Sequence, residues 1–262
     1  MLKKRVLSGL IGALVALLFI YIGGLWYFFI VAALALLSLE EYYNFSLKGN
    51  YYFPRNFSFL TALIYLYLLY IQFPLILEIS PLIIFLPLCI YFLFQDRFKL
   101  RDLTFATWGF IYIIWFFGFL LALRFLPQGL SYTMLLFVSI WINDTAAFFT
   151  GSYLGKNKLL PRISPNKTVE GSIGGVLATS LFVLIVRGYL DLGLFTALML
   201  GFLISLSGQL GDLLESALKR HLELKDSGEI IPGHGGILDR FDSILLSAPL
   251  FYFYIKFLKQ ML

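Results

Sequence analysis

Apolar segments long enough to cross a lipid bilayer make up almost the whole chain, and this constrains the fold more than any other feature. A membrane helix needs about 20 apolar residues, and its backbone polar groups must be satisfied within the element. Of the 262 residues, 60% are hydrophobic and 13% are charged, whereas soluble domains carry roughly 25% charged residues. The sequence therefore predicts an all-α, polytopic integral membrane protein with no separate soluble domain.

The apolar runs predict about nine transmembrane helices. The predicted spans are residues 6–22, 25–39, 57–73, 80–94, 104–123, 131–150, 171–188, 192–215 and 243–260. Only Gly23 and Gly24 separate the first two runs, which could form a tight helical hairpin or one bent span. We interpret residues 1–262 as a single transmembrane domain, with N-terminal spans in 1–128 and catalytic helices in 129–262.

The basic residues predict how these spans are oriented. With nine crossings and a cytoplasmic N-terminus, 16 of the 20 Lys and Arg residues fall on the cytoplasmic side. This bias matches the excess of basic residues in cytoplasmic loops of membrane proteins. The net charge of +5 is therefore a topology signal, and no nucleic-acid partner is expected. Most of the acidic residues also fall on the cytoplasmic side, so we expect an active site that opens there.

The polar segment 216–242 interrupts this apolar chain. Charges next to a bilayer are costly, so a dense cluster of them indicates a functional site. Asp239 and Asp242 are three residues apart and would share one face of a helix, where two carboxylates can hold Mg²⁺. The alternative is a pair of solvated acidic residues in the first turn of a helix.

A second polar stripe lies at the end of the preceding span. Asp212 could complete the metal site, while Lys219 and Arg220 could bind phosphates. The alternative for Lys219 is an ion pair with Glu215 four residues earlier. Asp144 lies inside an apolar run, so it should have a partner, either a shared metal or a Ser or Thr hydroxyl of another helix.

Glycines surround three of the polar motifs. Gly233, Gly235 and Gly236 flank His234 and would let the backbone approach an anion closely, although a simple turn is the alternative. The pairs Gly151/Gly155 and Gly171/Gly175 predict close packing of helices. Thr168 could cap the N-terminus of the span that follows it.

Taken together, these motifs resemble the signature of the phosphatidate cytidylyltransferases, or CDP-diacylglycerol synthases. The matching positions are Asn143, Asp144, Ser164 to Gly171, Ser216, Lys219, Arg220, Lys225, Asp226, Pro232 to Gly236, Asp239, Arg240 and Asp242. The resemblance implies that CTP and phosphatidic acid give CDP-diacylglycerol and pyrophosphate. It also implies Mg²⁺, a contribution from K⁺, a homodimer, and a location in the inner or plasma membrane of a prokaryote.

The resemblance and the charges together suggest roles for the site residues. The metal-site candidates are Asp144, Asp212, Asp239 and Asp242. Five basic residues are expected to face phosphates, namely Lys167, Lys219, Arg220, Lys225 and Arg240. His234 and its neighbouring glycines would line the nucleotide or the pyrophosphate.

Three other classes of membrane protein fit the sequence less well. CDP-alcohol phosphotransferases and prenyltransferases also use carboxylates and Mg²⁺, but with longer Asp spacings than those found here. A transporter would place its charges near mid-membrane, whereas these acidic residues gather at one side. A purely structural membrane protein would not need such a cluster.

Overall fold

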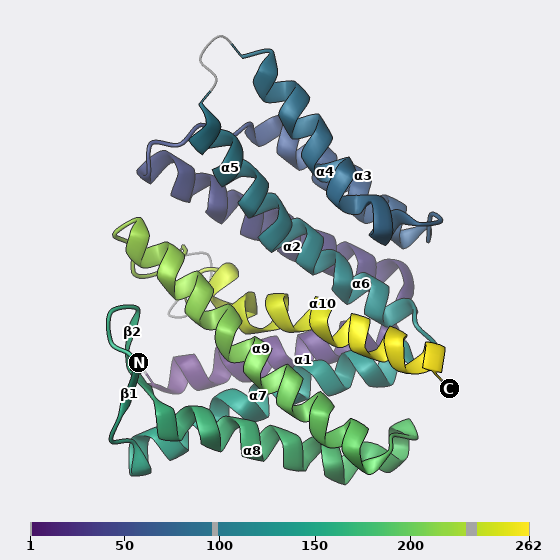
Figure 1. Ribbon diagram of the computed structural model, residues 1–262, viewed down its shortest axis with the longest axis vertical. Helices are drawn as coiled ribbons and strands as arrows, with labels where there is room; N and C mark the ends of the chain where they lie inside the picture. Colours follow the sequence, from purple (N-terminus) through teal and green to yellow (C-terminus); the bar gives the residue numbers. More distant parts are fainter. Residues whose placement is uncertain (1, 96–98, 229–234, 262) are drawn as a thin grey trace. The chain divides into compact units, whose positions relative to one another are not determined.

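The protein is helical almost throughout in the computed structural model, which describes residues 2–95, 99–228 and 235–261 (Figure 1). The first helices are α1 (Leu2–Ile22), α2 (Gly24–Lys48), α3 (Arg55–Tyr70), α4 (Ile76–Leu93), α5 (Leu100–Gly109), the π-helix η1 (Phe110–Trp115) and α6 (Phe116–Phe125). They are followed by α7 (Gly129–Leu154), β1 (Lys158–Leu160), β2 (Ser164–Thr168), α8 (Val169–Val186), the 3₁₀-helix η2 (Arg187–Leu190), α9 (Leu194–His221) and α10 (Leu238–Met261).

The helices confirm an all-α polytopic membrane protein. Within the described ranges, seven helical segments are long and apolar enough to cross a bilayer, and α5, η1 and α6 count together as one of them. Each of the nine predicted apolar runs coincides with a helix, but the apolar parts of α1 and α3 are shorter than the others. The number of crossings and the cytoplasmic N-terminus remain predictions.

Gly23 separates the first two helices. Its backbone has φ 67° and ψ −155°, a combination that is available essentially only to glycine. Gly24 follows with φ 54°. The chain therefore ends α1 and begins α2 at this point instead of continuing as one regular helix.

Two compact units make up the chain. The first contains Met1–Ala122 and Asp226–Asp239, and the second contains Leu123–Lys225 and Arg240–Leu262. We refer to them as unit 1 and unit 2 and describe each by itself. The predicted functional division at residue 128 remains a prediction.

Aromatic side chains hold α2 against α5 in unit 1. The hydroxyl of Tyr42 donates to the Phe105 carbonyl over 2.9 Å, and the two rings stack with centroids 4.6 Å apart. Tyr51 stacks on Phe105 as well, at 4.3 Å. Tyr42 is fully buried, so its hydroxyl needs this partner. These contacts fix the C-terminal half of α2, including the residue next to Tyr42, Glu41.

Close backbone approach shapes unit 2, in which α7, α8 and α9 pack along one another (Figure 1). A Cβ atom added to Gly171 would lie 2.7 Å from the carbonyl oxygen of Ala147 and 3.2 Å from Cα of Gly151. A Cβ added to Gly175 would lie 2.6 Å from Oδ1 of Asn143. The prediction of close helix packing is therefore confirmed for Gly151, Gly171 and Gly175, whereas Gly155 follows the end of α7 and lies against Thr168.

A short antiparallel hairpin of β1 and β2 connects α7 to α8. Thr168 ends β2 and is the N-cap of α8, where its hydroxyl accepts a hydrogen bond from the Gly171 amide over 3.1 Å. The Glu170 carboxylate accepts from the amides of Lys156 (3.1 Å) and Asn157 (3.2 Å). The predicted cap is confirmed, whereas the hairpin itself was not predicted. Its contacts fix the register of the segment that carries Lys167.

Candidate functional site

Three carboxylates and one lysine form a cluster in unit 2. Asp144 comes from the second half of α7, Asp212 from the second half of α9, and Asp242 from the first turns of α10, while Lys167 comes from β2. Lys167 Nζ lies 2.5 Å from Asp212 Oδ2. Asp144 and Asp242 lie close enough to interact electrostatically with both of these groups. The fold thus brings together three predicted metal-site residues and one predicted phosphate-binding residue.

A network of buried polar side chains is hydrogen-bonded to one carboxylate of the cluster. Asn143 is 1% exposed, and its Oδ1 accepts from Ser205 Oγ over 2.5 Å and from Gln209 Nε2 over 3.0 Å. Gln209 also hydrogen-bonds the side chain of Ser172, which joins α8 to the network. Asn143 Nδ2 in turn donates to Asp144 Oδ1 over 2.9 Å. The network therefore links three helices to one carboxylate of the cluster.

This network changes the interpretation of Asp144. The sequence offers a Ser or Thr hydroxyl of another helix as one possible partner of Asp144. The structure gives that interhelical role to Asn143, and Asp144 is exposed and bonded to its own neighbour. An exposed carboxylate held by a buried network can face a ligand without loss of packing.

The charges of the cluster suit a hard cation. Three carboxylates face one lysine, so the group carries an excess of negative charge when all are ionised. Among the described residues, no group of three or more His, Cys, Asp or Glu side chains is placed to hold one metal ion. Mg²⁺ commonly uses only one or two protein carboxylates, with water and substrate phosphates as its other ligands. One or two of Asp144, Asp212 and Asp242 would be enough for such a site.

The other basic residues of unit 2 have mixed surroundings. Lys219 Nζ lies 2.6 Å from Glu215 Oε2, and the two side chains are 11% and 1% exposed. The predicted alternative of an ion pair is therefore present. Arg220 is exposed and donates to the carbonyls of Leu224 (3.1 Å) and Ile163 (3.4 Å). Two further predicted phosphate ligands are exposed, Lys225 and Arg240.

Asp239, the remaining metal-site candidate, lies in unit 1 and is surrounded by hydrogen-bond donors. Its Oδ2 accepts from the Ser227 amide and the Gly236 amide, each over 2.9 Å, and lies 2.9 Å from the Ser227 hydroxyl oxygen. Asp239 and Asp242 do lie on one helix, as predicted, three residues apart in α10. The structure shows a separate set of contacts for each carboxylate.

Glu41 was missed in the sequence analysis. It lies in α2 and is 1% exposed, and Oε1 accepts from the Ile237 amide over 2.7 Å. Oε2 accepts from the Leu238 amide over 2.8 Å and from the Ser227 hydroxyl over 3.0 Å. The available signal was an acidic residue at the end of an apolar run, because a buried charge needs partners.

The described glycines of the predicted anion loop approach the protein's own carboxylates. A Cβ added to Gly236 would lie 2.5 Å from both carboxylate oxygens of Glu41, and one added to Gly235 would lie 2.5 Å from Asp239 Oδ2. Gly235 also has φ 78°, which favours glycine. Two predicted ligand contacts, Gly233 and His234, lie outside the described residues, and their roles remain predictions.

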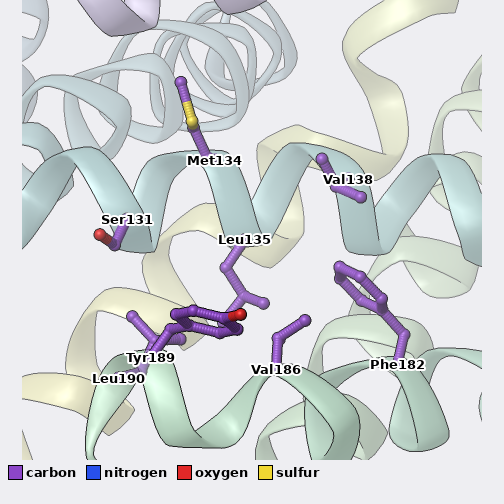
Figure 2. Close-up of a pocket in the computed structure, with 8 residues that line it drawn as sticks. All are labelled: Ser131, Met134, Leu135, Val138, Phe182, Val186, Tyr189 and Leu190. Atoms are coloured by element: carbon purple, nitrogen blue, oxygen red, sulfur yellow. The ribbon is translucent and has the colours of Figure 1, made fainter.

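An apolar hollow of about 170 Å³ lies between α7 and the end of α8 in unit 2 (Figure 2). Leu135, Phe182 and Val186 point into it. The lining residues are otherwise Ser131, Met134, Val138, Tyr189 and Leu190. The hollow lies at the opposite end of these helices from the carboxylate cluster and has no charged lining, so it suits hydrocarbon and not a nucleotide.

Comparison with known proteins agrees with the chemistry of the cluster. The sequence profile of the cytidylyltransferase family matches residues 3–258. A phosphatidate cytidylyltransferase of Bacillus subtilis is 37% identical, over 96% of this chain and 97% of that protein. Proteins of the same name from Staphylococcus epidermidis and Staphylococcus aureus are 36% identical, over 95% of this chain and 97% of theirs. The similarity therefore includes both the membrane helices and the polar segments between them.

Proposed function

We propose, because this chain belongs to the cytidylyltransferase family, that it transfers CMP from CTP to phosphatidic acid and releases pyrophosphate. The observation that carries the proposal is the identity of 37% over 96% of the chain with a phosphatidate cytidylyltransferase. Such an enzyme needs a site at the membrane surface that accepts a charged nucleotide and a lipid phosphate. The cluster of Asp144, Asp212, Asp242 and Lys167 has the charges required.

The reaction joins two phosphates. A phosphate oxygen of phosphatidic acid attacks the α-phosphorus of CTP and forms a new P–O bond, while the bond from the α-phosphorus to the bridging oxygen breaks. The electron pair of that bond leaves with pyrophosphate. Because the attacking phosphate is already ionised near neutral pH, no strong general base is required. Catalysis then depends mainly on positioning and on balancing negative charge.

Lys167 is the residue in the cluster suited to hold a phosphate. It is paired with Asp212 in the structure, and both side chains are about one-third exposed, at 28% and 32%. A nucleotide phosphate can therefore reach the ammonium group. One or two of Asp144, Asp212 and Asp242 would hold Mg²⁺, which neutralises phosphate charge when bound. The contribution of K⁺ rests on the family resemblance.

The proposal also covers the orientation of the site in the membrane, the cellular location and the oligomeric state. The cluster lies at one end of α7, α8, α9 and α10, and the distribution of basic residues assigns that end to the cytoplasm, where CTP is available. We extend the proposal to the cytoplasmic membrane of a bacterium, since the relatives compared here are bacterial. A homodimer is also part of the proposal and rests on the resemblance alone.

Purified protein in detergent provides the test. It would be supplied with phosphatidic acid, Mg²⁺, K⁺ and each labelled nucleoside triphosphate in turn. Transfer of label into lipid from CTP, with an equal amount of pyrophosphate, is the expected result. Pyrophosphate without labelled lipid would indicate a hydrolase instead. Folded protein that forms neither product would contradict the proposal.

A further inference from the structure

Glu41 is tied to the start of α10 by contacts that the proposed reaction does not explain. It is an acidic side chain in α2, and almost no solvent reaches it. Its partners lie at positions 227, 237 and 238, nearly 200 residues later in the chain. All these residues belong to unit 1. A buried carboxylate with this many donors must have a fixed orientation.

The contacts complete the N-terminus of a helix. The first amides of a helix have no partner within the helix, and an acidic group there is favourable. Glu41 accepts from the amide of Ile237, which precedes α10, and from that of Leu238, its first residue, with one oxygen for each. A neutral amide side chain would present one oxygen and one NH₂ group to these two donors. Only a carboxylate accepts from both.

Ser227 connects Glu41 to Asp239. Its hydroxyl lies 3.0 Å from Glu41 Oε2 and 2.9 Å from Asp239 Oδ2, and it has one proton to donate. The Ser227 amide also donates to Asp239. The Gly236 amide donates to Asp239, and a Cβ atom added to Gly236 would collide with Ser227 Oγ and with both carboxylate oxygens of Glu41. A shift of Glu41 would therefore move the start of α10 and Asp239 with it.

We propose that Glu41 is a positioning residue, which fixes the start of α10 and Asp239 in the orientation that the cytidylyl transfer needs. This inference rests on the proposed function. We expect no direct contact between Glu41 and either substrate. It acts through Ser227 and through the backbone of residues 236–238, and a 1 Å displacement of a reacting group can cost about 100-fold in rate.

The chain offers a matched control. Glu40 precedes Glu41 in α2, but its carboxylate is 31% exposed and pairs with Arg55 over 2.7 Å. Glu40→Gln therefore removes an acidic charge from the same turn of the helix without touching α10. Ser227→Ala is a milder second variant, because it removes a hydroxyl and leaves the buried carboxylate with both backbone donors.

The experiment measures kcat and KM for CTP and for phosphatidic acid, together with the folded fraction, in wild type, Glu40→Gln, Glu41→Gln and Ser227→Ala. We expect Glu41→Gln to lower kcat/KM for CTP by about 10- to 100-fold, including a higher KM for CTP, and Glu40→Gln to match wild type. Ser227→Ala should also lower kcat/KM and raise KM for CTP, but by a smaller factor than Glu41→Gln. A purely structural role would lower kcat in proportion to the folded fraction and leave KM unchanged.

Hydrogen exchange separates this inference from the proposed function. The amides of Ile237 and Leu238 should exchange faster in Glu41→Gln than in Glu40→Gln, with or without substrate. Equal exchange in the two variants would overturn the inference, and so would wild-type kinetics in Glu41→Gln or a loss of folded fraction alone. A wild-type protein that makes no lipid product would overturn the proposed function, and with it the role of Glu41 in catalysis, while faster exchange would still establish the contact.

Discussion

Carboxylates in the two units of this protein have different surroundings. In unit 1, Glu41 and Asp239 are surrounded by amide and hydroxyl donors, and Glu41 is almost fully buried. In unit 2, Asp144, Asp212 and Asp242 gather around one ammonium group, and Asp144 is exposed. The first arrangement satisfies its charges within the protein. The second leaves an excess of negative charge, which a cation and phosphates can balance.

The difference shows how one residue type serves two purposes. A carboxylate that accepts two or three N–H and O–H bonds holds backbone in place, and its removal leaves several donors unpaired. A carboxylate next to a lysine can exchange that partner for a metal or a substrate. We therefore expect substitution of Glu41 or Asp239 to affect both folding and activity, and substitution of Asp144, Asp212 or Asp242 to affect activity with little change in folding.

The largest effect should come from Asp144→Asn. The loss of one negative charge from the cluster should lower kcat by about 100- to 1,000-fold, because charge balance at the phosphates is the main catalytic contribution. The melting temperature without Mg²⁺ should match wild type, and its increase on Mg²⁺ addition should shrink. Asp191→Asn is the matched control, since Asp191 has φ 52° and asparagine tolerates that conformation. Near-normal activity in Asp144→Asn would show that Asp144 has no role in the proposed active site.

Asp239→Asn should have the next largest effect on activity. It tests whether this carboxylate of unit 1 contributes to stability as well as to activity. The Ser227 and Gly236 amides both donate to Asp239 Oδ2, and the neutral amide oxygen of asparagine is a weaker acceptor than a carboxylate oxygen. We expect about a 100-fold loss of activity and a lower melting temperature, the latter absent in Asp144→Asn. Thermal unfolding and initial rates on the same preparations measure both. Loss of activity without any loss of stability would indicate that Asp239 has the same kind of role as Asp144, Asp212 and Asp242.

Lys167→Gln tests the cation of the cluster and should have a smaller effect. It breaks the ion pair with Asp212 and removes the proposed phosphate contact, so KM for CTP should rise by about 10-fold or more. Arg162→Gln, in the exposed turn of the same hairpin, is the control. Titration of CTP at saturating phosphatidic acid gives both constants. An unchanged KM for CTP would assign Lys167 a structural role only.

Much of the fold could be predicted from the sequence because the bilayer limits the choices. Runs of apolar residues can only be helices there, so every predicted span coincides with a helix. The π-helix η1 within Leu100–Phe125 has no comparable signal, since its residues are apolar and aromatic like most of those in the α-helical segments on either side. The hairpin of β1 and β2 is equally hard to predict, because its strands are only three and five residues long and β2 contains a proline.

The candidate site could be predicted in part. Helical spacing pointed to Asp212 and Asp242, and the position of Asp144 inside an apolar run pointed to that residue; the structure brings these three together. The spacing of Asp239 and Asp242 in one helix is correct, but spacing cannot reveal that Ser227 and Gly236 surround Asp239. Glu41 was missed because its partners lie far away in sequence, and local patterns carry no information about such contacts.

The smallest effect should come from Gln209→Met, which tests whether the cluster in unit 2 depends on buried support as unit 1 does. Methionine keeps the length of glutamine but removes the donor to Asn143 and the hydrogen bonds with Ser172. The unpaired groups should cost about 1–3 kcal/mol of stability. Asp144 keeps its bond from Asn143, so we expect only a several-fold loss of kcat, with an unchanged KM for CTP. Thermal unfolding and CTP titration measure the two effects. A loss of kcat as large as that in Asp144→Asn would mean that the buried network orients the Asp144 carboxylate. The carboxylates of both units would then depend on buried hydrogen bonds for their orientation.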